Sequence, residues 1–403
     1  MVLIAAFLGW MFDGFEMGIF TLVARPALMQ MQRLSGHVDE AFVGHWMGLI
    51  TALFLVGAAL GGIVFGWLGD KIGRVRALTL SVLTYSIFSG LVYFATEPWH
   101  LGAARFVAAL GMGGEWSLGV ALVMEVWPSN SRSKLAGLIG VAGNSGVALI
   151  AVFGILFSVT EDSWRWVALV GTVPALLTLC IRFYVPESER WKKTAVKAQS
   201  HPVREVLGKD LWRVTLLACG LSSIALIGTW AAVQWLPLWA DQMTGGHLPK
   251  AKAYTQVIFS VGSVVGSVFG AWLSAQIGRR WSFFLLSFGS LASCAVLFRL
   301  VDSYGGTFLT LSFVVGLLTG SYYGWLPLYL PELFPTRVRA TGQGLCFNAG
   351  RVLAAVGAIE MGVLLKEFSG SYAKAGAVTS LVYAVGLVII WFAPETKDRG
   401  IPE

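Results

Sequence analysis

The chain is a succession of long apolar runs separated by short polar loops. Twelve of these runs are close to the length of about twenty apolar residues that a membrane-spanning helix needs. They fall near residues 2–28, 44–68, 75–95, 98–126, 134–158, 165–185, 213–240, 253–276, 281–301, 306–331, 340–365 and 373–393. A spanning β-strand needs only about ten residues, so these runs are too long for a barrel. The pattern predicts an all-α polytopic membrane protein with twelve transmembrane helices.

Composition supports this prediction. Charged residues make up 13% of the 403 positions and hydrophobic residues 56%, and the mean hydropathy is +0.71. A soluble domain carries roughly 25% charged residues. The lipid bilayer is therefore an expected partner of the chain, and a water-soluble fold is excluded.

Sequence signatures of several enzyme classes are absent. No GxxxxGK[ST], HExxH or GxSxG motif occurs, which argues against a built-in ATPase, a zinc protease and a serine hydrolase. The five histidines are scattered without metal-ligand spacing, and the four cysteines lie inside apolar runs. We expect no enzymatic activity, no metal and no cofactor.

Basic residues are distributed unevenly over the predicted loops. If the N-terminus is cytoplasmic, eighteen lysines and arginines lie on the inner side against about seven on the outer side. Because cytoplasmic loops carry the excess of basic residues, both termini are predicted to be cytoplasmic in a plasma (inner) membrane protein. The net charge of +7 is then a topology signal, and no nucleic-acid partner is expected.

The two halves of the chain resemble each other. The one long polar stretch divides it into an N-terminal six-helix bundle (1–186), a cytoplasmic linker (187–212) and a C-terminal six-helix bundle (213–403). At a constant offset of 205, Gly57, Gly61, Trp67 and Arg74 recur as Gly262, Gly266, Trp272 and Arg279. Internal repeats of this kind are typical of secondary transporters, which bind substrate near the midplane between the halves. The Gly57/Gly61 and Gly262/Gly266 pairs are predicted to be close helix contacts.

Several motifs resemble a known family. GWLGDKIGR (66–74), PESERW (186–191), PETKDRG (394–400) and Arg105-x5-Gly111-x-Gly113-Gly114 resemble signatures of the major facilitator superfamily. FLGWMFDGFEMGIF (7–20) and PELFPTRVRATGQGLCFNAGR (331–351) are most similar to its metabolite–proton symporter branch, of sialate and carboxylate type. The resemblance implies two pseudo-symmetric six-helix bundles, a proton gradient as the energy source, and function as a monomer.

The chain departs from that family pattern at two places. Ala275 stands in the second half where the first half has Asp70, so the two inner-loop motifs carry unequal charge. The predicted seventh helix has a single glutamine, Gln234, where sugar porters carry a pair. The polar signature that yeast-type lactate permeases carry in the same helix is absent as well, so a hexose and a lactate assignment are both weakened.

Charged residues inside the predicted helices cost about 2.5–3.5 kcal/mol each on insertion scales and so require a reason. Arg351 lies near the middle of the eleventh helix with no acidic residue one turn away. Its planar guanidinium group suits a substrate carboxylate, a role that the family resemblance also implies. The alternative is an ion pair with another helix that serves assembly alone.

Two further helices carry buried charges. Asp13 and Glu16 lie three residues apart on the first helix and so share a face. Carboxylates this close repel, which favours protonation of one of them. Arg105 and Glu115 share the fourth helix, where Arg105 is placed to pair with Asp13 or Glu16. These four residues are the candidates for proton coupling, and a helix-locking ion pair is the competing interpretation.

Other polar residues are candidates for gating or for lining the cavity. Gating by salt bridges that break on inward opening is predicted for residues at the inner helix ends: Asp70, Arg74, Glu125, Arg132, Glu332 and Arg339. Candidate substrate contacts besides Arg351 lie on the fifth, seventh, tenth and eleventh helices: Asn144, Trp230, Gln234, Tyr322, Tyr323 and Asn348. Aromatic residues in membrane helices also pack or anchor at interfaces.

The sequence thus predicts a proton-coupled importer of a small organic anion that works by alternating access. A neutral sugar porter is the nearest alternative, but it leaves Arg351 without a substrate partner. A drug exporter would favour a cavity poorer in arginine. A non-transporting membrane sensor is a further alternative, against which the Asp70–Arg74 motif and Asp13 argue.

Overall fold

The computed structural model describes residues 2–34, 40–126, 131–157, 159–173, 184–189, 191–192, 202–245, 247–248, 250–397, 399 and 402. Every regular element in these ranges is helical. Eleven segments within them are long and apolar enough to cross a membrane. The predicted all-α fold is confirmed, while most of the expected sixth span, residues 174–183, lies outside the described residues.

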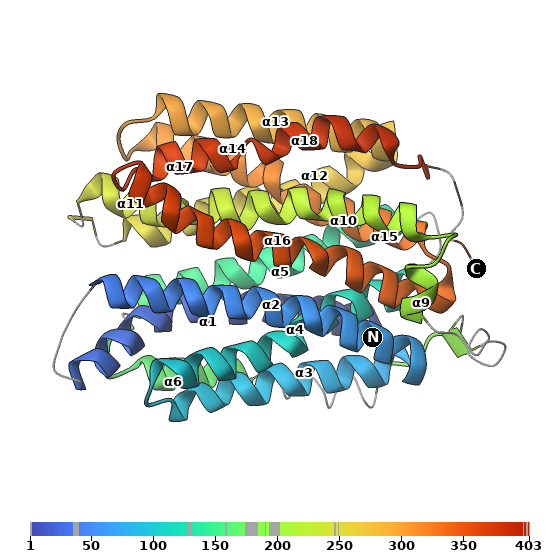
Figure 1. Ribbon diagram of the computed structural model, residues 1–403, viewed down its shortest axis with the longest axis horizontal. Helices are drawn as coiled ribbons and strands as arrows, with labels where there is room; N and C mark the ends of the chain where they lie inside the picture. The colour runs from blue at the N-terminus through green and yellow to red at the C-terminus, as the bar shows by residue number, and fades with distance from the viewer. Residues whose placement is uncertain are drawn as a thin grey trace.

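The first half of the chain forms one group of helices, drawn in blue to green in Figure 1. Its elements are α1 (Val2–Leu34), α2 (Glu40–Ile72), α3 (Arg74–Leu91), α4 (Pro98–Val126), α5 (Arg132–Leu156) and α6 (Trp164–Leu169). Helix α4 packs against α2 and α3, and α1 packs against α5. This arrangement places α4, which carries Arg105 and Glu115, inside the group.

The second half forms the other group. Its elements are α10 (Trp212–Ile227), α11 (Leu236–Thr244), α12 (Ala251–Ile277), α13 (Arg279–Leu300), α14 (Gly306–Gly320), α15 (Tyr322–Leu333), α16 (Arg339–Glu367), α17 (Tyr372–Thr379) and α18 (Val382–Ile389). A short helix, α9 (Pro202–Val206), precedes them and contacts the start of α16. We call the end of the molecule where α9 and both termini lie the linker end (Figure 1).

Three predicted spans of the second half are interrupted. Between α10 and α11 the backbone changes to a π-turn at Gly228–Ala232 and a 3₁₀ turn at Val233–Trp235. The tenth span breaks at Ser321 between α14 and α15, and the twelfth between α17 and α18. Short π-segments inside helices are frequent at functional sites, and this one carries Trp230.

The two halves meet along two pairs of helices, α2 with α16 and α5 with α12. Within each half, glycines permit close packing. A side chain on Gly61 would overlap the Leu110 carbonyl of α4, and one on Gly266 would overlap the Leu317 carbonyl of α14. The predicted glycine contacts are therefore confirmed, at equivalent positions of the two halves.

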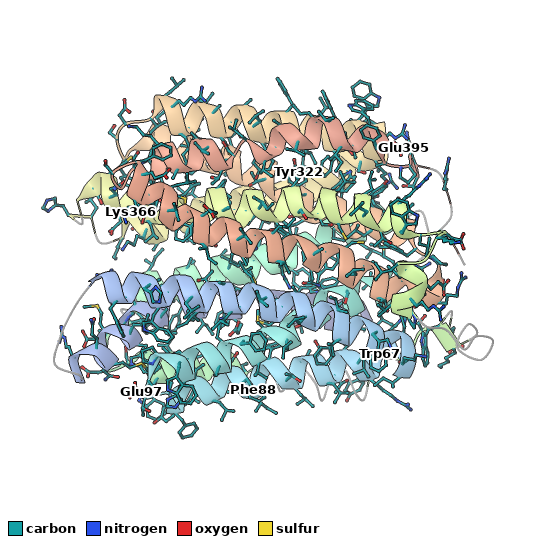
Figure 2. The ribbon with its side chains drawn as sticks, viewed as in Figure 1. Trp67, Phe88, Glu97, Tyr322, Lys366 and Glu395 are labelled. Carbon is teal, nitrogen blue, oxygen red and sulfur yellow. The ribbon has the colours of Figure 1, made fainter. Side chains whose placement is uncertain are left out.

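The exterior is apolar along its flanks and charged at its ends. Figure 2 shows Glu97 and Lys366 at one end, Glu395 at the linker end, and Phe88 on the flank between them. Large apolar side chains such as Trp67, which is 42% exposed, cover the sides of the helices. An outer surface of this kind suits a lipid environment.

Candidate functional site

Five ionisable residues lie buried in the middle of the helices. Asp13 and Glu16 come from α1, Arg105 and Glu115 from α4, and Arg351 from α16. Each is at most 8% exposed. The structure thus brings the four predicted proton-coupling residues into the same half as one another and places Arg351 across from them.

Glu16 and Arg105 form a salt bridge inside the first half. Nη1 of Arg105 donates to Oε1 of Glu16, and the Ser89 hydroxyl donates to the same oxygen at 2.8 Å. The guanidinium carbon of Arg105 also lies 4.5–4.8 Å from the ring centres of Phe54 and Phe20. Of the two partners expected for Arg105, Asp13 and Glu16, it is Glu16 that forms the ion pair, so the positive charge of Arg105 balances the charge of Glu16.

Arg351 has a different environment. Its Nη1 donates to Oδ1 of Asn348 at 2.8 Å, and its guanidinium carbon lies 5.2 Å from the centre of the Phe347 ring. Its Nε has no hydrogen-bond partner in the described part of the chain, and no described carboxylate lies within salt-bridge distance of it. Arg351 therefore carries a buried positive charge and has N–H groups that are free to donate further hydrogen bonds.

The other buried arginines all have carboxylate partners. Arg74 pairs with Asp70 and Glu125, Arg279 with Glu332, and Arg339 with Glu125; Arg105 pairs with Glu16 as described above. Removing a buried charge from water is costly unless it is paired. Arg351 departs from this rule among the described residues, and a bound anion would restore it.

Asp13 is the carboxylate that faces Arg351. The charges acting on Asp13 are those of Arg351, Glu16 and Arg105, and Asp13 in turn acts on Arg351. Its Oδ1 has no hydrogen-bond partner among the described residues. The attraction between Asp13 and Arg351 crosses from one half to the other, so it depends on how closely the halves approach.

Glu115 lies apart from both arginines. It is 1% exposed, and neither of its oxygens makes a hydrogen bond of ordinary geometry within the described residues. The groups that face it are Asp13 on α1 and the Tyr85 hydroxyl on α3. No ion pair joins Glu115 to Arg105 in the described residues, and the helix-locking pair of the competing interpretation is the one between Arg105 and Glu16.

Aromatic contacts between the halves lie on both sides of the charged cluster. Trp116 of α4 stacks on Phe347 of α16 with ring centres 3.8 Å apart and an interplanar angle of 11°. Phe54 of α2 approaches Trp230 at 5.9 Å. Arg105, beside Phe54, and Trp116 are eleven residues apart on α4, or about 16 Å. The sequence analysis did not single out Phe54, Trp116 or Phe347, because periodicity does not reveal which rings meet across two helices.

The predicted lining residues are spread over several places. Asn348 is fully buried and donates to the Gly113 carbonyl of the first half at 3.4 Å, besides contacting Arg351. Asn144 makes the corresponding crossing on the other side, donating to Ser267 of α12 at 3.3 Å. Both asparagines thus bridge the halves at equivalent repeat positions.

The aromatic candidates differ in position. Trp230 and Gln234 are half-buried in the interrupted region after α10. Tyr323 donates to the Thr229 hydroxyl at 3.0 Å, and its hydroxyl lies within electrostatic range of Arg351. Tyr322 lies within the second half (Figure 2), 2.8 Å from the Ser287 hydroxyl. Tyr323 is thus the candidate that interacts with Arg351. Tyr322 contacts Ser287 inside the second half, and its predicted contact with substrate stays a prediction.

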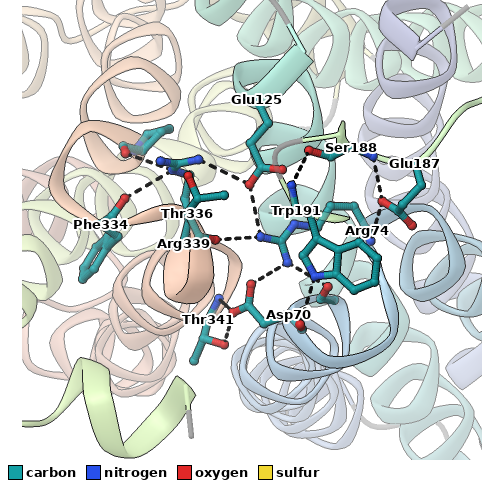
Figure 3. A network of polar contacts seen from close by, with 12 residues as sticks. Asp70, Arg74, Glu125, Glu187, Ser188, Trp191, Phe334, Thr336, Arg339 and Thr341 are labelled. Carbon is teal, nitrogen blue, oxygen red and sulfur yellow. Dashed lines mark hydrogen bonds and ion pairs between the residues drawn. The ribbon is translucent and has the colours of Figure 1, made fainter. Parts of the chain in front are cut away.

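A polar network joins the two halves at the linker end (Figure 3). Arg74 donates to Asp70 at 2.5 Å, to Glu125 at 3.1 Å and to the Thr336 carbonyl of the second half at 2.9 Å. Asp70 also accepts from the amide and hydroxyl of Thr341, at 2.9 and 2.5 Å. The predicted pairing of Asp70 with Arg74 is confirmed, and the network crosses the interface through Thr336 and Thr341.

The second copy of this motif stays within its own half. Arg279 donates to both oxygens of Glu332 at 2.7 and 3.0 Å, and Thr396 donates to the same carboxylate at 2.5 Å. Ala275 has no carboxylate with which to reach α5, as the sequence difference from Asp70 predicts. Predicted gate residue Arg132 has a side chain outside the described residues.

Two glutamates from the PES and PET motifs cap helices beside these networks. Glu187 accepts from the amides of Arg74 and Val75 at 2.9 and 3.1 Å. Glu395 accepts from the amides of Arg279 and Arg280 at 3.0 and 3.1 Å. Partial burial raises the pKa of Glu395, but the backbone donors outweigh it, so its pKa lies below the usual range. Sequence reasoning quoted both motifs without assigning this role.

The described residues also form a pocket at the protein surface. A cavity of about 330 Å³ lies at the linker end, lined by Trp67, Pro202, Val203 and Arg204. It is remote from the buried charges and holds no carboxylate. No described group of three or more His, Cys, Asp or Glu residues is placed to hold a metal ion.

Comparison with known proteins identifies the architecture. The family model described as Major Facilitator Superfamily matches residues 2–257, and the model described as Sugar (and other) transporter matches residues 192–403. The chain belongs to the major facilitator superfamily. It is a membrane transporter and not an enzyme, which confirms the family resemblance drawn from the motifs.

Similar members of the superfamily cover nearly the whole chain. A Haemophilus influenzae protein named for metabolite transport is 32% identical over 99% of this chain and 97% of its own length. The cis,cis-muconate transport protein of Acinetobacter baylyi is 26% identical, covering 87% and 86%. The sialic acid transporter NanX of Escherichia coli is 27% identical, covering 96% and 92%.

A solved structure shares the fold. The proton:xylose symporter XylE bound to 6-bromo-6-deoxy-D-glucose superposes with a TM-score of 0.82 at 18% identity, covering 99% of this chain and 97% of that chain. Superfamily architecture thus extends over the full set of described helices.

Proposed function

We propose that this transporter is a proton-coupled symporter of a small organic carboxylate and works by alternating access in the plasma (inner) membrane. The single observation that carries the proposal is Arg351, the buried arginine for which the described residues supply no carboxylate partner. A substrate carboxylate would accept two parallel hydrogen bonds from such a group. The anionic substrates named for the muconate and sialic acid relatives agree with this assignment.

Coupling follows from competition between two anions for one guanidinium. In the unloaded protein, Asp13 faces Arg351 across the halves. A substrate carboxylate on Arg351 takes over that charge, so Asp13, still buried, loses the cation that faces it and binds a proton. Proton and substrate thereby favour the same closed form, which is what coupling requires. Asn348 would hold Arg351 in place, with Tyr323 and Asn144 as further lining residues.

The remaining assignments belong to the same proposal. The domains are the bundles 1–186 and 213–403 with the linker 187–212, and the basic loops orient both termini to the cytoplasm. The linker end is then the cytoplasmic end, and the network of Asp70, Arg74, Glu125 and Arg339 closes it. The protein would work as a monomer without a cofactor.

The test is uptake into proteoliposomes. Gentisate, nicotinate, N-acetylneuraminate and cis,cis-muconate are offered beside glucose and xylose, with and without an inward proton gradient. We expect gradient-stimulated uptake of at least one carboxylate and its loss, by a factor of about 10 or more, in Arg351→Ala and Arg351→Lys, since lysine lacks the planar fork. The matched control is Arg299→Ala, at an exposed arginine of α13. Uptake of a hexose that ignores the gradient would instead establish a neutral sugar porter.

A further inference from the structure

Carboxylates outnumber guanidinium groups in the buried cluster. Asp13, Glu16 and Glu115 face two arginines, Arg105 and Arg351, in the described part of the chain. Arg105 neutralises Glu16, and Arg351 acts on Asp13. The third carboxyl group, that of Glu115, has no cation left to it.

The surroundings of Glu115 contain no cation among the described residues to balance a negative charge. The titratable groups facing it are Asp13 and Tyr85, and the backbone of Gly9 on α1 lies directly against Oε1. No arginine acts on it, and the side chain is 1% exposed. An unpaired carboxylate buried in this way neutralises itself by taking up a proton. A buried Glu115 without a cation is therefore expected to hold a proton in this arrangement of the helices.

Substrate binding increases the number of unpaired carboxyl groups to two. Once an anion occupies Arg351, Asp13 has lost the cation that faces it and Glu115 has none, while a negative charge on Asp13 acts unfavourably on Glu115. Two carboxylates in such a buried cluster do not ionise together. The loaded, closed protein thus holds one proton on an oxygen of Asp13 and a second on an oxygen of Glu115.

A route for releasing the second proton is present next to it. Trp116 follows Glu115 in the chain, and its stack on Phe347 is a contact between the halves on the linker-end side of Arg351. Separation of the halves at that end breaks the stack and admits water to this level of α4. Hydration removes the cost of ionising Glu115, which then releases its proton to the water on that side.

We propose that Glu115 is a second proton site, so that two protons accompany each monovalent carboxylate and import carries one net positive charge inward. The proposal rests on the proposed function, because it needs an anion on Arg351. It predicts an electrogenic transporter, whereas a Glu115 that keeps its proton throughout the cycle makes transport of the same monoanion electroneutral.

The experiment distinguishes electrogenic from electroneutral transport by testing whether the membrane potential alone drives uptake. Radiolabelled gentisate, nicotinate or N-acetylneuraminate, all monoanions at pH 7, is added outside the proteoliposomes. A potassium gradient with valinomycin sets the membrane potential. At equal pH on both sides, an inside-negative potential of about 59 mV should raise the accumulation ratio about tenfold in the wild type. In Glu115→Gln the same potential should have no effect, while a proton gradient still drives uptake through Asp13.

The controls make each outcome decisive. Glu360→Gln, which alters an exposed carboxylate of α16, should keep the tenfold response to potential. A wild type driven by the proton gradient but indifferent to potential overturns the two-proton proposal and leaves the proposed function standing. A Glu115→Gln protein that keeps the full response overturns the assignment to Glu115. Absence of gradient-driven uptake of every carboxylate overturns the proposed function itself. The wild-type measurement stands even if Glu115→Gln fails to fold.

Discussion

At the scale of single residues, the site depends on which charges have partners. Two arginines at similar depth, Arg105 and Arg351, look alike in the sequence but differ in the structure. Arg105 is neutralised by Glu16 and enclosed by two aromatic rings. Arg351 has spare donors and faces Asp13 from the other half. This difference is the basis for the proposed structural role of the Glu16–Arg105 pair and the proposed anion binding at Arg351.

Asp13 is predicted to be needed for full accumulation but not for exchange. In Asp13→Asn the site keeps Arg351 and accepts the anion, but the side chain no longer takes up and releases a proton. Counterflow exchange of labelled carboxylate should therefore remain within about threefold of wild type, while accumulation driven by a proton gradient falls, because the proton on Glu115 is then the one that still accompanies the anion. Both are measured in the same proteoliposomes, with Glu360→Gln as the control. Undiminished accumulation in Asp13→Asn would remove this residue from the mechanism.

At the scale of elements, helix number and order were predictable, and helix interruptions were not. Runs of apolar residues locate spans because the bilayer demands length and apolarity. The π-turn at Gly228–Ala232 and the break at Ser321 leave no such mark, since both segments are as apolar as an unbroken helix. The repeat motifs indicated that Arg74 and Arg279 occupy equivalent positions, and each pairs with a glutamate of a neighbouring helix, Glu125 or Glu332.

Partner choice between helices was the part that the sequence did not determine. Helical periodicity places Asp13 and Glu16 on one face but does not tell which of them reaches Arg105. It likewise gives no sign that Trp116 meets Phe347, since those residues are more than two hundred positions apart. The capping role of Glu187 and Glu395 was also missed, although their equivalent positions in the two halves were visible.

The cap at the start of α13 gives a pH-dependent prediction. The pKa of Glu395 is lower in the folded protein than in the unfolded chain, so its stabilising effect is full above the usual glutamate range and is lost as the pH falls through the lowered value. A carboxylate at a helix N-terminus contributes about 0.3–1 kcal/mol. Thermal unfolding in detergent should place Glu395→Gln below wild type from pH 8 to pH 6.

The difference between Glu395→Gln and wild type should narrow in acid. It should shrink as the pH falls below about 4, where the wild-type carboxylate takes up its proton. Glu360→Gln serves as the comparison, because its carboxylate is exposed and caps no helix. A gap that stays constant down to the acid limit would show that the charge of Glu395 contributes nothing to the cap.

At the scale of the whole molecule, the contacts between the halves are unequal. The linker end is joined by Asp70, Thr341, Arg74 and Thr336 on the α2–α16 side, whereas the equivalent Arg279–Glu332 pair remains inside the second half. On the opposite side of the buried charges, an aromatic pair, Phe54 and Trp230, lies between the halves with its rings tilted. Under the proposed mechanism, opening of the linker end breaks the hydrogen bonds that join the halves there.

The central claim is that a substrate anion and Asp13 compete for Arg351, so that binding the anion draws a proton into the protein. The direct measurement is the pH change when a transported monoanion is added to purified protein in weakly buffered solution near pH 8, where Asp13 begins ionised beside Arg351. We predict alkalinisation of the medium by about one proton per bound anion, absent in Arg351→Ala. Saturable binding of the anion with no proton uptake would contradict the account.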